Sequence, residues 1–210
     1  QFPLVARLLG VEGYGTAVLI MGWVGLVTAL LGVQTRKTMV KYFSLFLADK
    51  SEPKALAVVK LGIGLNLLLS TLTCALLFIA APQLSIWLLD NPDGTLFLRM
   101  VVLRDFFAST SGTTTTVLRV LDRFKWLSVF SALSSIATFV LVSTVLIAGW
   151  NLKGYLAAMM LVSAGQSITL YLACHRDLRT RYRANWWQAD LQMLREHKHE
   201  IKEMLLSLKL

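Results

Sequence analysis

Five long apolar segments are the feature that most restricts what this chain can fold into. They lie at about residues 16–33, 57–80, 96–118, 127–148 and 155–174. As helices rising about 1.5 Å per residue, all five are long enough to cross a hydrocarbon layer roughly 30 Å thick. Only α-helices and closed β-barrels can span a bilayer, and the strands of a barrel need only about 10 residues each. The sequence therefore predicts an all-α, polytopic membrane protein with five to six antiparallel transmembrane helices.

Lys and Arg residues are concentrated in alternate connections along the chain. Segments 35–54 and 119–125 and the tail 175–210 are rich in them, whereas 81–95 has none and 149–154 has only Lys153. Connections enriched in Lys and Arg are the cytoplasmic ones. We therefore expect 35–54, 119–125 and 175–210 to face the cytoplasm. The short connections also predict that successive helices lie side by side.

The composition agrees with residence in a bilayer. The 210 residues are 56% hydrophobic and 16% charged, and the formal net charge is +9. This charge does not indicate nucleic-acid binding, because the basic residues are distributed loop by loop and are not gathered on one face. Cys74 and Cys174 lie within or at the end of apolar segments, which favours packing over a disulfide. No catalytic, metal-binding or cofactor-binding pattern is found, so we predict that the chain is not an enzyme.

The third apolar segment carries charge where lipid tolerates it least. Arg104 and Asp105 lie about 12–14 Å along a helix that begins near residue 96, at a depth where a charge costs at least about 2.5 kcal/mol. Steps of three and four lead from Arg104 to Arg119 through polar or small residues, and a parallel stripe starts at Asp105. We expect this side to face a water-filled cavity or tight packing. The apolar residues of the opposite side are expected to face lipid: Val102, Leu103, Phe106 and Val117.

Two interpretations of the polar side remain open. In the functional one, Arg104 and Arg119 are fixed positive charges that line a cavity for an anionic substrate. In the structural one, Arg104 contacts a carboxylate or a backbone carbonyl and holds two helices together. Asn66 in the second segment and Gln166 in the fifth are further candidates for the cavity, with helix packing as their alternative.

Several shorter segments carry expectations of their own. Segment 41–49 either extends the first span or lies on the inner surface, and 84–89 lies near the outer interface. Pro82 and the sequence NPDG at 91–94 punctuate the loop between the second and third spans. After a transmembrane domain of residues 1–183, the periodic apolar residues of 184–210 predict an amphipathic helix, either interfacial or a cytoplasmic linker. Residues 2–9 could end an earlier span, so we expect a piece of a longer protein.

Residues 6–15 read ARLLGVEGYG, and this run resembles the first outside loop of prokaryotic polysaccharide-exporting flippases. These proteins form the Wzx-like branch of the multidrug/oligosaccharidyl-lipid/polysaccharide exporter superfamily. Weaker similarities follow in the same order at 38–42 (TMVKY), 118–125 (LRVLDRFK) and 149–154 (GWNLKG). The resemblance covers about residues 4–183.

The resemblance implies two lobes of six helices about a central cavity, with both termini cytoplasmic, in the inner membrane of a prokaryote. The five segments would be helices two to six of the amino-terminal lobe, and 184–210 would lead to the second lobe. The implied activity is the flipping of an undecaprenyl-diphosphate-linked oligosaccharide, the repeat unit of an O-antigen, capsule or exopolysaccharide, from the inner to the outer leaflet. An isolated lobe could not alternate access in this way, so either the chain is a fragment or two chains pair.

Depth and stripe geometry then suggest substrate-binding residues. Arg104 and Arg119 would contact the diphosphate or acidic sugars, and Asp105 would tune them or couple transport to a cation. Arg36 and Lys37, at the cytoplasmic end of the first span, could meet the headgroup first. The alternatives are a cation-coupled multidrug exporter of the same superfamily, which would favour more carboxylates than Asp105 alone, and a non-transport membrane scaffold subunit. A membrane-bound transferase is less favoured because acid–base residues are missing.

Overall fold

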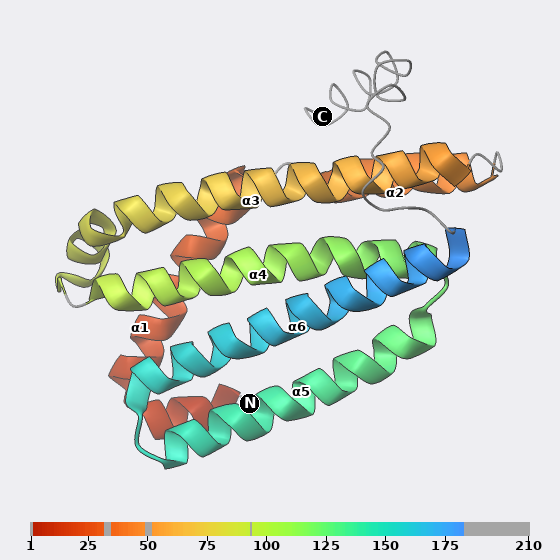
Figure 1. Ribbon diagram of the computed structural model, residues 1–210. Coiled ribbons are helices and arrows are strands. Elements are labelled where there is room, and N and C mark those ends of the chain that lie inside the picture. The colour runs from red at the N-terminus through yellow and green to blue at the C-terminus, as the bar shows by residue number, and fades with distance from the viewer. Residues whose placement is uncertain (1, 32–34, 49–51, 93, 183–210) are drawn as a thin grey trace.

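The computed structural model describes residues 2–31, 35–48, 52–92 and 94–182, and these residues are almost entirely helical. The described helices are α1 (Phe2–Leu31), α2 (Thr35–Ala48), α3 (Glu52–Leu89), α4 (Gly94–Val120), α5 (Phe124–Ile147) and α6 (Asn151–Tyr182) (Figure 1). The all-α fold class predicted from the sequence is thereby confirmed. The segment 184–210, for which an amphipathic helix is predicted, lies outside the described residues.

Helices α3 to α6 lie side by side in a spatial order that differs from their order in the chain. Figure 1 shows α3, α4, α6 and α5 in succession, and α4 packs mainly against α3 and α6. Consecutive helices run in opposite directions, and the members of the pairs α3–α4 and α5–α6 are neighbours, as predicted. The expectation that α4 and α5 lie side by side is wrong. A short turn fixes only the distance between two helix ends, so α5 diverges from α4 and α6 fills the space between them.

Helix α1 lies crosswise to these four helices and contacts all of them (Figure 1). It is not one continuous helix, because Gly10 interrupts it with φ 72° and ψ 170°. That backbone region is essentially restricted to glycine. The glycine of the ARLLG sequence is therefore required at this break, and residues 2–9 form a helical segment distinct from the first apolar span.

Segment 41–49 falls largely in a separate helix, α2, which packs on α3. Met39 and Phe43 are buried against residues of the first half of α3, whereas Lys41 is exposed. Gly62 of α3 permits this contact, because a side chain there would overlap the Met39 sulfur. The helix is thus amphipathic, with its apolar side held by α3.

Pro82 does not end the second span, contrary to the expectation from the sequence. It lies inside α3, which continues to Leu89 and so includes the segment 84–89. The Ser85 hydroxyl donates a hydrogen bond to the Pro82 carbonyl oxygen at 2.8 Å. Proline removes one backbone donor and bends a helix, but neighbouring side chains and helices can satisfy the groups that it frees.

Four helices of the described residues are long and apolar enough to cross a membrane. Their apolar stretches are Val5–Leu30, Ala55–Leu89, Phe124–Ile147 and Asn151–Thr180. Helix α4, where the third of the five predicted spans lies, has 27 residues and is long enough, but it is too polar to meet the same criterion. Between 6% and 22% of the most apolar stretch of each of the four helices is buried within the protein. Their remaining apolar surface requires lipid around it, and the chain is a multi-pass membrane protein.

The buried hydrophobic residues form two clusters, one toward each end of the bundle. The first cluster joins α1 with the end of α3, the start of α4 and the start of α6, and it includes Ile20, Leu98 and Leu156. The second cluster joins α2 with the start of α3, the end of α4 and the end of α6, and it includes Val59 and Leu178. Between them the same helices carry polar residues, so the apolar packing is interrupted at mid-length.

We expect Gly154→Ala to disturb the junction of α5 and α6. A Cβ on Gly154 would overlap the Cβ of Trp150 and approach Val145 to 2.5 Å. Overpacking of this kind lowers the free energy of unfolding by about 1–3 kcal/mol, which a thermal melt of the purified protein in detergent would detect. Gly165→Ala in the same helix is the control, because nothing lies within 4 Å of its Cβ position. Equal losses in the two variants would contradict the prediction.

Candidate functional site

A polar layer separates the two apolar clusters at mid-length of the bundle. It is defined by five residues: Asn66 and Ser70 of α3, and Arg104, Asp105 and Ser109 of α4. On each helix these residues lie between the positions that join the first cluster and those that join the second. Three of the residues predicted to bind substrate, Asn66, Arg104 and Asp105, thus lie between the two clusters.

Arg104 and Asp105 form an ion pair within α4. The Arg104 Nη1 donates to the Asp105 Oδ1 at 3.3 Å, and the two side chains are 27% and 21% exposed. The pairing considered as the structural alternative is therefore present, but its partner belongs to the same helix and does not join two helices. A charge inside a span is tolerated when it is paired or faces water. Here Arg104 and Asp105 are paired with each other. Because both side chains are partly exposed, they can also contact water.

Two tyrosines, Tyr14 of α1 and Tyr155 of α6, lie near the Arg104–Asp105 pair. Tyr155, in the first turns of α6, is buried and lies close enough to Arg104 and to Tyr14 of α1 to interact with both electrostatically. Arg104 is therefore within electrostatic range of the start of α6, and Tyr155 is in turn within range of Tyr14 on α1. A polar phenol beside a guanidinium adds a further group that can accept or donate a hydrogen bond at this level.

Hydroxyl and amide groups of the layer link α3 to α4. The Ser70 and Ser109 hydroxyl oxygens are 2.9 Å apart, and the Ser109 hydroxyl also approaches the Asn66 Oδ1 at 3.4 Å. Side-chain hydrogen bonds between helices stabilise membrane bundles by about 0.6 kcal/mol each on average. Asn66, a predicted cavity residue, therefore also takes part in helix packing.

The Ser and Thr residues that follow on α4 satisfy their hydroxyls within their own helix. Thr114 donates to the Thr110 carbonyl at 2.7 Å, and Thr115 and Thr116 donate one turn back at 2.8 Å each. Such bonds let a polar sequence lie in an apolar medium without unpaired donors. The run 113–116 therefore needs no substrate to explain it.

Half of the side of α4 that was expected to face lipid is buried in the protein, whereas Leu103 and Phe106 of that side are half-buried. Val102 and Val117 are 3% and 0% exposed, because α4 lies between α3 and α6 and packs its apolar residues against them. On the stripe that starts at Arg104, Ala108 and Arg119 are exposed, and Ser111 and Thr115 between them are half-buried. The polar or small side of this helix thus faces outward from the chain.

The remaining predicted site residues are not brought to the polar layer. Arg119 is exposed in the last turn of α4, roughly 22 Å along the helix from Arg104. Gln166 is half-buried on α6, roughly 16 Å along the helix from Tyr155, the α6 residue that approaches Arg104. Arg36 and Lys37 begin α2, and their side chains lie outside the described part of the structure.

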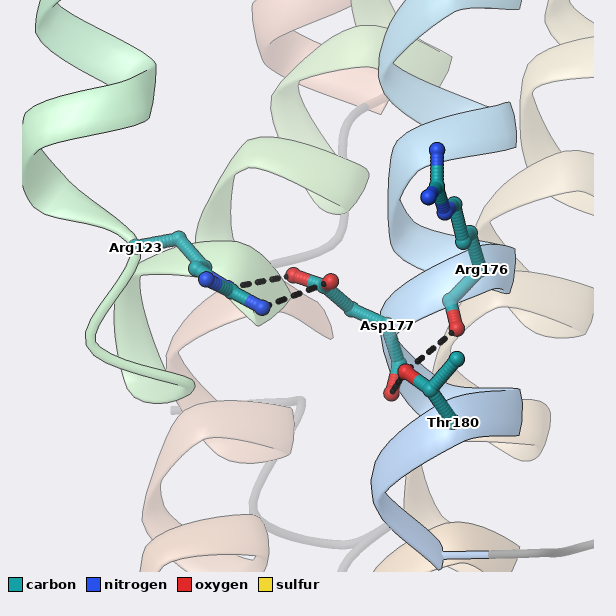
Figure 2. A network of polar contacts seen from close by, with 4 residues as sticks. All are labelled: Arg123, Arg176, Asp177 and Thr180. Carbon is teal, nitrogen blue, oxygen red and sulfur yellow. Dashed lines mark hydrogen bonds and ion pairs between the residues drawn. The ribbon is translucent and has the colours of Figure 1, made fainter.

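One end of the bundle carries the basic connection 119–125 and the last turns of α6, and we call it the basic end. A groove and an ion pair at this end were not predicted from the sequence. Arg123, which follows α4, binds Asp177 of α6 through two hydrogen bonds, from Nε at 2.7 Å and from Nη2 at 2.9 Å (Figure 2). The pair borders a groove of about 530 Å³. The two residues are 54 positions apart, and no local signal relates them.

The fold and the polar layer together define a class of protein: a multi-pass helical membrane protein with an ion pair at mid-length of one helix. Within the described residues, no three His, Cys, Asp or Glu side chains come together as a metal site would require.

The family model described as polysaccharide biosynthesis protein matches residues 1–207 of the 210. The chain belongs to this family, which confirms the resemblance seen in its sequence. The comparisons with curated proteins and with solved structures gave no match.

The contact between α3 and α4 predicts a difference between two serines of α4. Ser109→Ala should lower the free energy of unfolding by about 1 kcal/mol, because it removes both hydrogen bonds to α3. Ser111→Ala should have little effect, since the Ser111 hydroxyl donates only to the Ala108 carbonyl of its own helix. Thermal melts of the two variants in the same detergent make the comparison. A larger loss for Ser111→Ala would contradict it.

Proposed function

We propose that this chain is one lobe of a transporter that turns a lipid-linked oligosaccharide from the inner to the outer leaflet of a prokaryotic cytoplasmic membrane. The carrier would be undecaprenyl diphosphate. Membership of the polysaccharide biosynthesis protein family supports this proposal. The observation that carries it is the partly exposed Arg104–Asp105 pair at mid-length of α4, in a protein whose outer surface is otherwise strongly apolar.

The exposed side of α4 differs from the outer surfaces of its neighbours. On α3 and α5 large apolar residues face outward, among them Leu68, Leu72 and Ile136. On the second half of α4 the outward stripe runs through Ala108 and Arg119. An arginine and small residues are poor lipid contacts but suit a hydrated cavity. This surface is where we place the second lobe, with the cavity between the two lobes.

The chemistry of the cargo explains why such a cavity needs a cation. Sugar hydroxyls and a diphosphate lose many hydrogen bonds with water when they enter hydrocarbon, at a cost of several kcal/mol for each unpaired group. A guanidinium offers phosphate a planar pair of donors, and Arg104 is held by Asp105 at the level of the layer. Arg119, nearer the basic end, would contact the headgroup at a different stage of transfer, as would Arg36 and Lys37. The lipid tail would remain in the bilayer throughout.

Specific observations favour each of the two alternatives. Pairing of Arg104 with Asp105, and the bonds of Ser109 to α3, are what a non-transport scaffold subunit would use to hold its fold. A carboxylate at mid-depth is what a cation-coupled multidrug exporter would use for coupling. Function in cells, and not stability alone, separates these possibilities.

Arg104→Ala is expected to reduce glycan export at least about tenfold, because a charge-assisted hydrogen bond to phosphate is worth roughly 1.5–3 kcal/mol. Export would be measured as surface glycan in cells that express the complete protein, at membrane levels checked by immunoblot. Lys125→Ala, which removes the same charge from an exposed position, is the control. Normal export by Arg104→Ala at normal protein levels would remove Arg104 from the site.

Exchanging the two charges distinguishes transport from scaffolding. The double variant Arg104→Asp, Asp105→Arg keeps an ion pair but moves the cation about 100° around the helix. We expect it to restore the protein level lost in Arg104→Asp alone, without restoring export. Restored export would favour a purely structural pair. Loss of export in Asp105→Asn, with export retained in Arg104→Ala, would favour the cation-coupled exporter.

The proposed orientation places the α4–α5 turn in the cytoplasm and the α3–α4 turn outside. In a background that lacks Cys74 and Cys174, Asn91→Cys should react with a membrane-impermeant maleimide in intact cells. Lys125→Cys should react only after the cells are permeabilised. The reverse pattern would overturn the orientation drawn from the basic residues.

A further inference from the structure

We propose that the groove at the basic end of α5 and α6 binds an anionic phospholipid. Its lining comes from the end of α4, the start of α5 and the last turns of α6: Leu118, Arg123, Trp126, Thr169, Leu172, Ala173, Arg176, Asp177 and Thr180. The phosphate would lie beside Arg176 and Arg123, and the first part of an acyl chain would lie along the apolar half. This site is separate from the polar layer around Arg104.

The lining changes from apolar to charged along α6. Thr169, Leu172 and Ala173 come first, and Arg176 and Asp177 follow within the next four residues. The Thr169 hydroxyl donates to the Gly165 carbonyl oxygen at 2.8 Å, so its own helix satisfies its polar group. On α4 and the turn after it the order is the same, with Leu118 before Arg123. A phospholipid has this division between chain and headgroup, whereas a free phosphate has no apolar part.

Arg123 is held in place by Asp177, as Figure 2 shows. The Arg123 Nε and Nη2 occupy both carboxylate oxygens of Asp177, at 2.7 and 2.9 Å. The Asp177 charge is therefore paired and does not oppose an incoming phosphate on its own. The Nη1 of Arg123 has no partner among the described residues, and a guanidinium donates in several directions of one plane. Asp177 is in this sense a positioning residue.

Arg176 gives the groove its net positive charge, because the charges of Arg123 and Asp177 balance each other. In Figure 2 its guanidinium points away from Asp177, back along α6, and it forms no ion pair within the described part of the chain. Two cations and one carboxylate line the groove, so its net charge is positive. An anionic headgroup is complementary to this charge, and a zwitterionic one gains less from it.

The size and level of the groove suit a lipid headgroup with part of a chain. A volume of about 530 Å³ falls within the roughly 300–1,000 Å³ of small-molecule sites. Trp126 lies on its rim and stacks on Phe130 with ring centroids 5.2 Å apart. Tryptophan is enriched at the level of lipid headgroups. Basic pockets between transmembrane helices are known binding places for anionic headgroups.

Lipid retention by the purified full chain tests this site directly. The delipidated protein would be offered phosphatidylglycerol or phosphatidylcholine, with bound lipid counted by native mass spectrometry. We expect the phosphatidylglycerol to be retained preferentially, and Arg176→Ala to weaken its retention about fivefold, the effect of one cation near an anionic headgroup. Arg179→Ala removes the same charge from the same helix but from outside the groove. It should leave retention almost unchanged.

A second variant tests the apolar half without touching a charge. Thr169 is exposed, so Thr169→Phe should fold and fill the groove where the chain would lie. It should weaken phosphatidylglycerol retention, whereas glycerol phosphate should not compete for the wild-type site. Equal weakening by Arg179→Ala and Arg176→Ala, equal retention of both lipids, or full competition by glycerol phosphate would each overturn the proposal. None of these measurements depends on oligosaccharide transport, so the two proposals can fail separately.

Discussion

Hydrocarbon around the protein is the constraint on which the rest of the structure depends. Polar groups of the backbone and side chains must find partners inside the protein, because the surrounding lipid offers none. The hydroxyls of α4 illustrate this, since Thr114, Thr115 and Thr116 each donate to a carbonyl one turn earlier in the same helix. Long helices follow from the same constraint, and so does the concentration of charge at helix ends and in turns. A charge that remains at mid-depth therefore needs a partner, water or a function.

Helix α4 is the part of the fold in which structural and functional demands meet. Its two ends are held by apolar clusters, through Leu98 and Val101 at one end and Val117 and Leu118 at the other. Between these clusters lies the polar layer with Arg104 and Asp105, where α1 and α6 also approach through Tyr14 and Tyr155. Rigid packing at both ends can hold charged side chains at a fixed level while leaving them partly exposed. In the proposed function, these side chains would line the cavity between the two lobes.

The ion pairs Arg104–Asp105 and Arg123–Asp177 have different physical origins. Arg104 and Asp105 are neighbours in the chain, so a helix keeps them close, although their side chains leave it about 100° apart and pair only through their chosen rotamers. Arg123 and Asp177 meet only because α6 inserts between α4 and α5 and brings its last turns to the turn after α4. The sequence therefore offers the first pair as one possibility among others, whereas the second depends on the packing order of the helices. The groove that we assign to a phospholipid depends on that same insertion.

The sequence by itself determined the all-α class, the long apolar helices, the approximate place of each connection and the family, because hydropathy and helix length are properties of contiguous residues. It also placed Arg104 and Asp105 near the middle of one helix, which the structure confirms for α4. Only the tertiary structure decided that Val102 and Val117 pack inward, that α3 continues through Pro82, and that α6 separates α4 from α5. The physical reason is that lipid and protein interior are equally apolar, so hydrophobicity cannot tell which side of a membrane helix faces which. That choice rests on shape and on contacts between residues far apart in the chain, such as Ser109 with Asn66 and Arg123 with Asp177.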